Sequence, residues 1–233
     1  MRFVKVDRVK TLWPFKLVLA LLLAVAPLSQ SPAESPRVQE KECPGNPLSP
    51  GSVAQSIWQT QIGEGFRAGT QMLGISTGTT WGILMLGGEQ RHHLALGTIS
   101  YGYMLSDIQA AGHWYRGNWE GRVELLGGAQ FEPDRCWVSG LAPHLRYNFA
   151  TGTRWIPFVD AGAGITLTNI GEPDLDSTFQ FNLQAGAGVN WFIKDNLAIS
   201  FEGRYLHISC AGLHNPNYGV NTLGILVGVG WFF

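Results

Sequence analysis

The sequence is poor in charge, in cysteine and in long apolar runs, and each shortage excludes a class of protein. Charged residues make up only 14% of the 233, while aromatic residues reach 12%, which is the reverse of a disordered chain. A formal net charge of −1 provides no basic surface and argues against nucleic acid as a partner. Three cysteines are too few for a disulfide scaffold. The composition leaves two classes, a soluble β protein and a membrane barrel.

The first 33 residues have the pattern of a secretory signal peptide. Five basic residues and one acid come first, ten continuous apolar residues follow at 17–26, and small residues lead to Ala33. The apolar run is shorter than the roughly 20 residues of a membrane-spanning helix, and no later window has 18 apolar residues in a row. We expect a signal peptide at 1–33, a flexible Pro-, Ser- and Glu-rich lead-in at 34–61, and a folded domain at 62–233.

The folded domain alternates between apolar and polar residues with a period of two. Six long segments alternate clearly, and two less regular candidates come before them. Six segments exceed ten residues, whereas strands of soluble proteins average about 5–6 and membrane-crossing strands need about 9–11. Eight segments predict an all-β fold, an eight-stranded antiparallel transmembrane β-barrel. The segments are 63–73, 94–104, 119–131, 139–149, 157–167, 178–191, 197–209 and 223–233.

Alternation alone also fits a soluble sandwich, so the direction of each face has to be argued. After residue 33 the chain has only two lysines, Lys41 and Lys194, although a water-facing sheet surface would carry more. The polar parity holds a nearly balanced set of charges, which suits a paired network inside a narrow barrel: Glu120, Arg122, Glu124, Arg146, Asp160, Glu202 and Arg204. Five tryptophans at segment ends suit interfacial girdles: Trp119, Trp137, Trp155, Trp191 and Trp231. We therefore favour an integral protein of the bacterial outer membrane.

An even number of strands places both chain ends on the periplasmic side. The expected extracellular connections are the long ones, at 74–91, 132–137, 168–177 and 210–220. The tight connections at 150–154 and 193–196 are expected on the periplasmic side, because such barrels have short periplasmic turns.

Three polar residues interrupt the apolar, lipid-facing parity at one end of the last two segments. His207 and Ser209 are two apart, so they share a face of a strand. Asn221 continues the same outward parity at the start of the final segment. An unpaired hydroxyl in an apolar setting costs about 1–3 kcal/mol, so the trio is either a set of headgroup contacts or a reactive site.

The stretch around these residues resembles a known family. Tyr205-Leu206-His207-Ile208-Ser209, followed by Ala211-Gly212-Leu213 and by Pro216-Asn217, Gly219 and Asn221, is similar to the signature of the lipid A 3-O-deacylase (acyloxyacyl hydrolase-like) barrels. The resemblance extends more weakly over 63–233, through 145–152 and 181–188.

The resemblance implies a membrane-embedded carboxylic ester hydrolase acting on lipid A of lipopolysaccharide in the outer leaflet. Ser209 would be the nucleophile and His207 the base that removes the 3-O-linked acyl chain, with no cofactor and no metal. We expect backbone amides near Ala211 and Gly212 to stabilise the oxyanion. The expected acyl path is lined by Tyr205, Leu223 and Ile225.

Two departures from the family pattern keep an alternative open. Cys210 stands where the family usually has Asn, and Asn221 stands where it often has an acid. An Asn can orient a His through its carbonyl but supplies no charge. The alternative is a non-enzymatic, lipid-binding or structural barrel with a degenerate site. A narrow channel is disfavoured by the balanced luminal charge, and a homodimer is left open.

Other candidate residues give weaker signals. Neighbours in a strand point to opposite faces, so His92 and His93 suit a surface pair better than a metal site. The acidic run Glu172, Asp174 and Asp176 suits a solvated loop better than a divalent-cation site, because no full ligand set is present. A disulfide between Cys136 and Cys210 is possible in an oxidising envelope, and two free thiols are the plainer interpretation.

Overall fold

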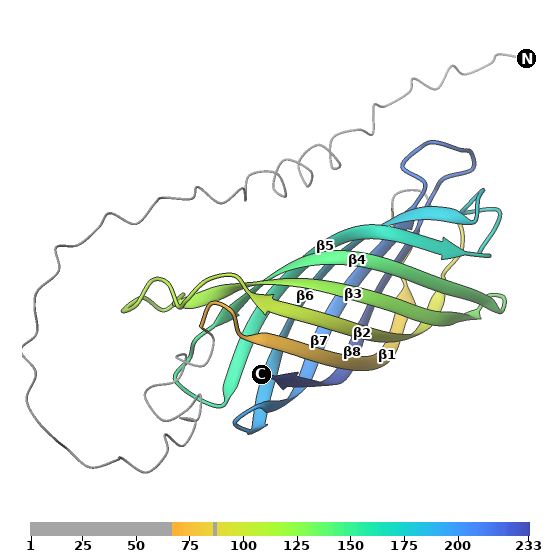
Figure 1. The fold of residues 1–233 in the computed structure, drawn as a ribbon. Helices are drawn as coiled ribbons and strands as arrows, with labels where there is room; N and C mark the ends of the chain where they lie inside the picture. The colour runs from red at the N-terminus through yellow and green to blue at the C-terminus, as the bar shows by residue number, and fades with distance from the viewer. Residues whose placement is uncertain (1–66, 86–87) are drawn as a thin grey trace, which may run out of the picture. The chain divides into compact units, whose positions relative to one another are not determined.

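The protein folds as a closed barrel of eight antiparallel strands (Figure 1). The computed structural model describes residues 67–85 and 88–233; the expected signal peptide and lead-in lie outside them. Neighbours in sequence are neighbours in the barrel, and β1 closes it against β8. No helix in the described residues is long and apolar enough to cross a membrane. The strands are β1 Gln71–Gly82, β2 His93–Met104, β3 Gly117–Glu132, β4 Cys136–Phe149, β5 Trp155–Thr168, β6 Phe179–Lys194, β7 Leu197–Ser209 and β8 Val220–Phe232.

The predicted fold is confirmed, but the first strand was placed too early in the chain. Strand β1 covers Gln71–Gly82 rather than 63–73, and the first four residues of the predicted segment lie outside the described part of the chain. The outward parity of β1 contains Thr77 and Thr79, which weaken the apolar alternation. The Thr77 hydroxyl donates to the Leu96 carbonyl at 3.0 Å, so this polar side chain has a hydrogen-bond partner on the neighbouring strand.

The lengths of two connections differ from the expected pattern of long extracellular loops and short periplasmic turns. The connection between β3 and β4 is only 133–135, although it lies at the end where long loops were predicted. The longest one, 105–116, joins β2 to β3 at the opposite end and projects at the left of Figure 1. A bridge between Gln109 and Gly117 and stacking of His113 on Tyr115 explain how this long connection holds a defined shape.

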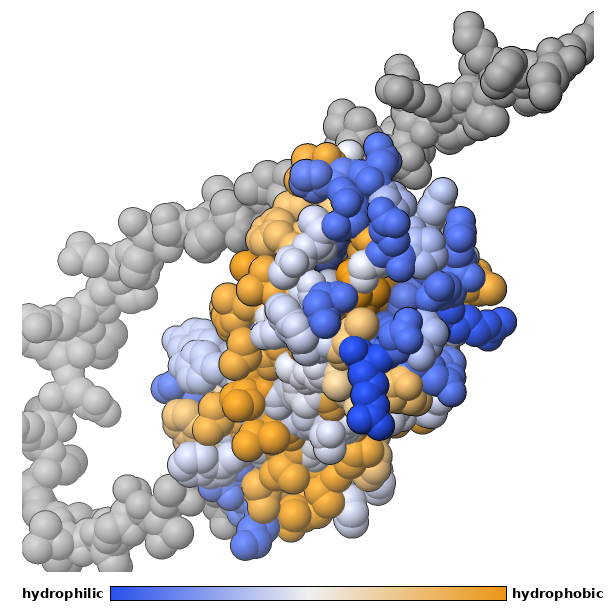
Figure 2. Space-filling view, turned by 90° about the vertical axis from the view of Figure 1, so that its right-hand side faces the viewer, coloured by the Kyte–Doolittle hydropathy of each residue, from blue (hydrophilic) through white to orange (hydrophobic). Residues whose placement is uncertain are grey.

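The outward face is apolar and the interior is polar, as a lipid-facing barrel requires. Ile75, Ile225 and Leu223 are each more than half exposed, whereas the charged residues of the alternate parity are buried, except for Arg122, which is partly buried. Figure 2 shows apolar side chains gathered beside hydrophilic ones on the face it presents. Trp155 and Trp191 stack at the end of their strands, with ring centroids 5.3 Å apart. The face assignment made from the sequence is therefore correct.

The lumen is filled by a paired charge network. Arg146 binds Asp160 at 3.1 Å and Glu202 at 2.9 Å, and Arg204 joins Glu202 to Glu124. Burial of unpaired charge is expensive, so mutual pairing explains why these residues occupy a closed interior.

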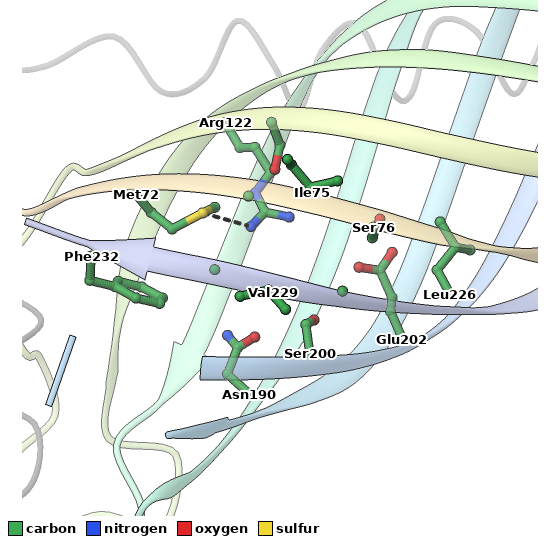
Figure 3. A pocket seen from close by; sticks show the side chains of 14 residues that line it. Met72, Ile75, Ser76, Arg122, Asn190, Ser200, Glu202, Leu226, Val229 and Phe232 are labelled. Atoms are coloured by element: carbon green, nitrogen blue, oxygen red, sulfur yellow. Dashed lines mark hydrogen bonds between the residues drawn. The ribbon is translucent and has the colours of Figure 1, made fainter. Parts of the chain in front are cut away.

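A small cavity of about 20 Å³ remains beside the luminal charge network, near the seam between β1 and β8 (Figure 3). It has room for about one water molecule. Arg122 and Glu202 line it together with Met72 and Phe232.

Candidate active site

His207, Ser209 and Asn221 form a hydrogen-bonded row on the outward side of β7 and β8. His207 and Asn221 are register partners across the two strands, and Ser209 lies two residues beyond His207. The His207 Nε2 atom is 2.9 Å from Ser209 Oγ, and its Nδ1 atom is 2.8 Å from Asn221 Oδ1. Strand alternation and antiparallel register are sufficient to assemble the trio that the sequence predicted.

The partners of Asn221 determine which ring nitrogen of His207 carries the proton. Asn221 Nδ2 donates to the Met85 carbonyl at 3.2 Å, so Oδ1 has to face the ring. The Tyr205 hydroxyl donates to the same Oδ1 at 2.6 Å. Because Oδ1 can only accept, His207 donates from Nδ1, and Nε2 is left as an acceptor for the Ser209 hydroxyl. That arrangement is the one a general base needs.

The trio is more enclosed than its place on the lipid-facing parity suggested. Ser209 is 6% exposed and Asn221 3%, while His207 and Tyr205 are half-buried. The 83–92 connection supplies part of the enclosure, because Met85 contacts Asn221 and the Ile83 amide donates to the Asn221 carbonyl at 2.9 Å. Exclusion of water strengthens hydrogen bonds within the trio.

The connection after Ser209 has two residues in the left-handed backbone region close to the Ser209 side of the trio. Ala211 has φ +57° and Gly212 φ +80°. The Cys210 amide donates to Asn217 Oδ1 at 2.9 Å, and the Leu213 amide donates to the Cys210 carbonyl at 3.1 Å. Within the described residues, the amides of Ala211 and Gly212 have no acceptor, so they remain available to an external oxygen.

Gly219 packs directly on the His207 ring. A Cβ at this position would lie 2.9 Å from His207 Cε1, and the residue has φ +80°. Both the short contact and the backbone angle favour glycine here.

We expect Gly219→Ala to displace the His207 ring. With His207 as the base expected from the sequence, turnover should fall by up to about a hundredfold, since a 1 Å misplacement of such a group can cost that much. Gly112→Ala is the matched control: Gly112 has φ +90° and an open surrounding, so it carries the same backbone strain of about 1–2 kcal/mol without touching the site. Equal activities of the two variants in a lipid A deacylation assay would contradict the prediction.

The three residues predicted to line the acyl path lie next to one another on β7 and β8 but differ in exposure and in contacts. Leu223 and Ile225 are 54% and 57% exposed on β8. Leu223 is the register partner of Tyr205, and Ile225 is opposite Gly203 on β7. Tyr205, predicted from the sequence only as a lining residue, also binds Asn221.

The weaker candidates have different environments from those expected. His92 is buried, and its Nε2 lies 2.8 Å from Asp174 Oδ2, whereas His93 lies 3.3 Å from Glu132. The prediction of a surface His pair was therefore wrong for His92. Asp174 is fully buried and not part of a solvated loop, because it accepts hydrogen bonds from a second connection. No group of three metal-ligating side chains occurs in the described residues.

Cys136 and Cys210 are both free. The Cys210 thiol contacts the backbone of His214, at 3.4 Å from its amide nitrogen. The free thiols agree with the plainer of the two interpretations of the sequence.

Sequence reasoning missed the Met85 carbonyl and Asp174 as parts of the site surroundings. A backbone carbonyl carries no residue-type signal, and Asp174 lies 84–85 residues from the amides it binds. The only available signal was the acidic residue itself within a loop at the same end of the barrel.

Comparison with known proteins identifies the family. The family model described as lipid A 3-O-deacylase (PagL) matches residues 91–230. No curated protein matches the sequence. Among solved structures, the outer membrane enzyme PagL has 22% identity and a TM-score of 0.50, covering 67% of this chain and 97% of that one. Neisserial surface protein A has 16% identity and a TM-score of 0.51, covering 71% and 98%. The chain belongs to the lipid A 3-O-deacylase family and is an integral protein of the bacterial outer membrane.

Proposed function

We propose that this barrel is an esterase that removes the 3-O-linked acyl chain of lipid A, with Ser209 as nucleophile, His207 as general base and Asn221 as the group that orients the base. The observation that carries the proposal is the continuous hydrogen-bonded row from Ser209 Oγ through His207 to Asn221 Oδ1. Family membership supplies the substrate class.

The reaction would proceed through an acyl-enzyme. Ser209 Oγ attacks the ester carbonyl as its proton passes to His207 Nε2, and the amides of Ala211 and Gly212 would receive the oxyanion. His207 then returns the proton to the departing sugar oxygen, so that the C–O bond breaks. Water, deprotonated by His207, attacks the acyl-enzyme and releases the fatty acid together with free Ser209.

The location of the trio suits a lipid substrate. Lipid A occupies the outer leaflet, and the row lies on the lipid-facing parity at one end of β7. The exposed Leu223 and Ile225 continue that face along β8, where they would contact the acyl chain. An acyl chain bound there would replace the hydrocarbon chains of membrane lipids, so the apolar contacts of Leu223 and Ile225 would be kept.

With Asn221 in place of an acid, we expect a lower turnover rate but not a complete loss of activity. In serine proteases, Asn in place of the triad acid costs about 10⁴ in kcat because it favours the wrong His tautomer. Here the Met85 carbonyl accepts from Asn221 Nδ2 and holds the amide the other way round. The remaining deficit is the missing negative charge beside the imidazolium.

The test is the lipid A mass spectrum of cells that express the protein. Loss of one 3-hydroxy acyl chain from position 3 is expected, and purified barrel incubated with lipid A should release the same fatty acid. A folded barrel, recognised by its different gel migration before and after boiling, that leaves lipid A intact would support the non-enzymatic, lipid-binding alternative instead.

Tyr205→Phe tests the support given to Asn221. Loss of the hydroxyl that donates to Oδ1 removes a hydrogen bond of about 1 kcal/mol, so we expect turnover to fall about fivefold. Tyr103→Phe, at the opposite end of the barrel on β2, is the control and should leave turnover unchanged. A Tyr205→Phe rate equal to that of the control would exclude this support.

A further inference from the structure

We propose that Asp174 is a positioning residue that holds the 83–92 connection against Asn221, and that this connection is what allows an amide to stand where an acid is common in the family. The inference rests on the proposed function, and it concerns how one side chain of that site keeps its orientation.

Asp174 is the point where the 83–92 connection is anchored. Its Oδ1 atom accepts from the Glu89 amide at 2.8 Å, and its Oδ2 atom accepts from the Gln90 amide at 3.0 Å. The side chain is fully buried although it comes from the separate 169–178 connection. Two amide donors on one buried carboxylate form charge-assisted hydrogen bonds, which are stronger than neutral ones.

His92 completes the partners of the carboxylate. Gln130 Nε2 donates to the Asp134 carbonyl at 2.9 Å, so Gln130 Oε1 is the atom that faces His92 Nδ1, at 2.7 Å. The other ring nitrogen faces Asp174 Oδ2 at 2.8 Å. Both ring nitrogens of His92 therefore face oxygen atoms of its neighbours, and the ring lies between Gln130 and Asp174.

The backbone of Asp174 also holds the connection that leads into β8. Its carbonyl accepts from the amides of Tyr218 and Gly219, both at 3.1 Å. Next to it, Leu175 forms a bridge with Asn217. One residue thus ties three connections together, 83–92, 169–178 and 210–219.

The other end of the 83–92 connection is tied to Asn221. The Ile83 amide donates to the Asn221 carbonyl at 2.9 Å, and the Met85 carbonyl accepts from Asn221 Nδ2 at 3.2 Å. The connection is therefore held at Asn221 on one side and at Asp174 on the other.

This arrangement matters because a carboxamide, unlike a carboxylate, has two chemically different ends. If Asn221 turned over, Nδ2 would donate to His207 Nδ1 and the ring proton would move to Nε2. Nε2 could then no longer accept the Ser209 proton. The Met85 carbonyl opposes that turn because it can only accept. The Gly88 amide donates to this carbonyl at 3.1 Å and precedes the Glu89 amide that Asp174 holds, so Asp174 keeps the carbonyl in place.

The experiment compares Asp174→Asn with Asp176→Asn in the full-length barrel. Asp176 lies in the same connection but pairs only loosely with the exposed His214, at 3.6 Å. We expect Asp174→Asn to lower the deacylation rate about tenfold or more and the control to keep its rate. In ¹⁵N spectra of histidine-labelled protein, the His207 proton should move partly from Nδ1 to Nε2 in Asp174→Asn only.

The same substitution in an Asn221→Asp variant shows whether Asp174 acts by orienting Asn221 or by stabilising this end of the barrel in general. In Asn221→Asp the carboxylate has two equivalent oxygens, so adding Asp174→Asn should change the rate by less than about twofold. An equal loss in both backgrounds, or an unchanged His207 tautomer in Asp174→Asn, would overturn the proposal. If Asp174→Asn does not fold, His92→Gln, which removes the ring facing Asp174 Oδ2 but keeps a side-chain amide donor, is read by the same two measurements.

The spectroscopic measurement does not depend on activity. A barrel that leaves lipid A intact but shows the tautomer change would refute the proposed function and support the role of Asp174. A barrel that cleaves lipid A but shows no tautomer change in Asp174→Asn would support the proposed function and refute the role of Asp174.

Discussion

Ser209→Ala is expected to abolish release of the 3-hydroxy fatty acid, with turnover falling by about three orders of magnitude or more. The methyl group has no lone pair to attack the ester, and His207 Nε2 loses the hydroxyl that lies 2.9 Å from it. The barrel itself should be unaffected, because Ser209 is at the last position of β7 and its side chain bonds only to His207 within the described residues. Lipid A mass spectra and fatty acid release are the two measurements.

Ser200→Ala is the matched control for this variant. Ser200 lies on the same strand but on the luminal parity, beside the small cavity (Figure 3). It should retain full turnover and normal gel migration. If Ser209→Ala still removed the acyl chain, another group would have to be the nucleophile, and the proposed mechanism would be wrong.

The strands were predictable wherever the two faces differ in chemistry. Strand β7 has the bounds expected from the sequence, because Phe201 and Tyr205 alternate with Glu202 and Arg204. The bounds of strand β1 were not predictable, since Thr77 is polar in the sequence but is acceptable at the lipid face because it donates to the Leu96 carbonyl. An alternating pattern of apolar and polar residues shows whether each side chain prefers lipid or water. It does not show whether a polar side chain has a hydrogen-bond partner within the barrel.

The same distinction explains how much of the site could be predicted. Period-two spacing was enough to bring His207, Ser209 and Asn221 to one face, and the outcome depended only on strand direction and register. The orientation of Asn221 depends on a backbone carbonyl, Met85, and on Asp174, a residue from another connection. Contacts between loops that are distant in sequence follow from the closed barrel and have no local sequence pattern.

The other large effect is expected in the lumen, where Arg204→Ala should destabilise the barrel by about 3–5 kcal/mol. Arg204 is buried between Glu124 and Glu202, and its Nε atom is 2.6 Å from Glu202 Oε1. Removing the guanidinium leaves two carboxylates in a closed interior without their main cation. Urea titration of the barrel in lipid vesicles, followed by tryptophan fluorescence, measures the change in the free energy of unfolding.

Arg154→Ala is the control for removing an arginine that has a carboxylate partner. Arg154 lies 3.2 Å from Asp195, but both side chains are about half exposed, so the loss should stay within about 1 kcal/mol. Adding Glu124→Gln to Arg204→Ala should recover part of the stability, because a neutral amide is less costly to bury unpaired than a carboxylate. If Arg204→Ala and Arg154→Ala cost the same, the luminal charges would have to be hydrated, and the barrel interior would be open to water instead of closed by its own ion pairs.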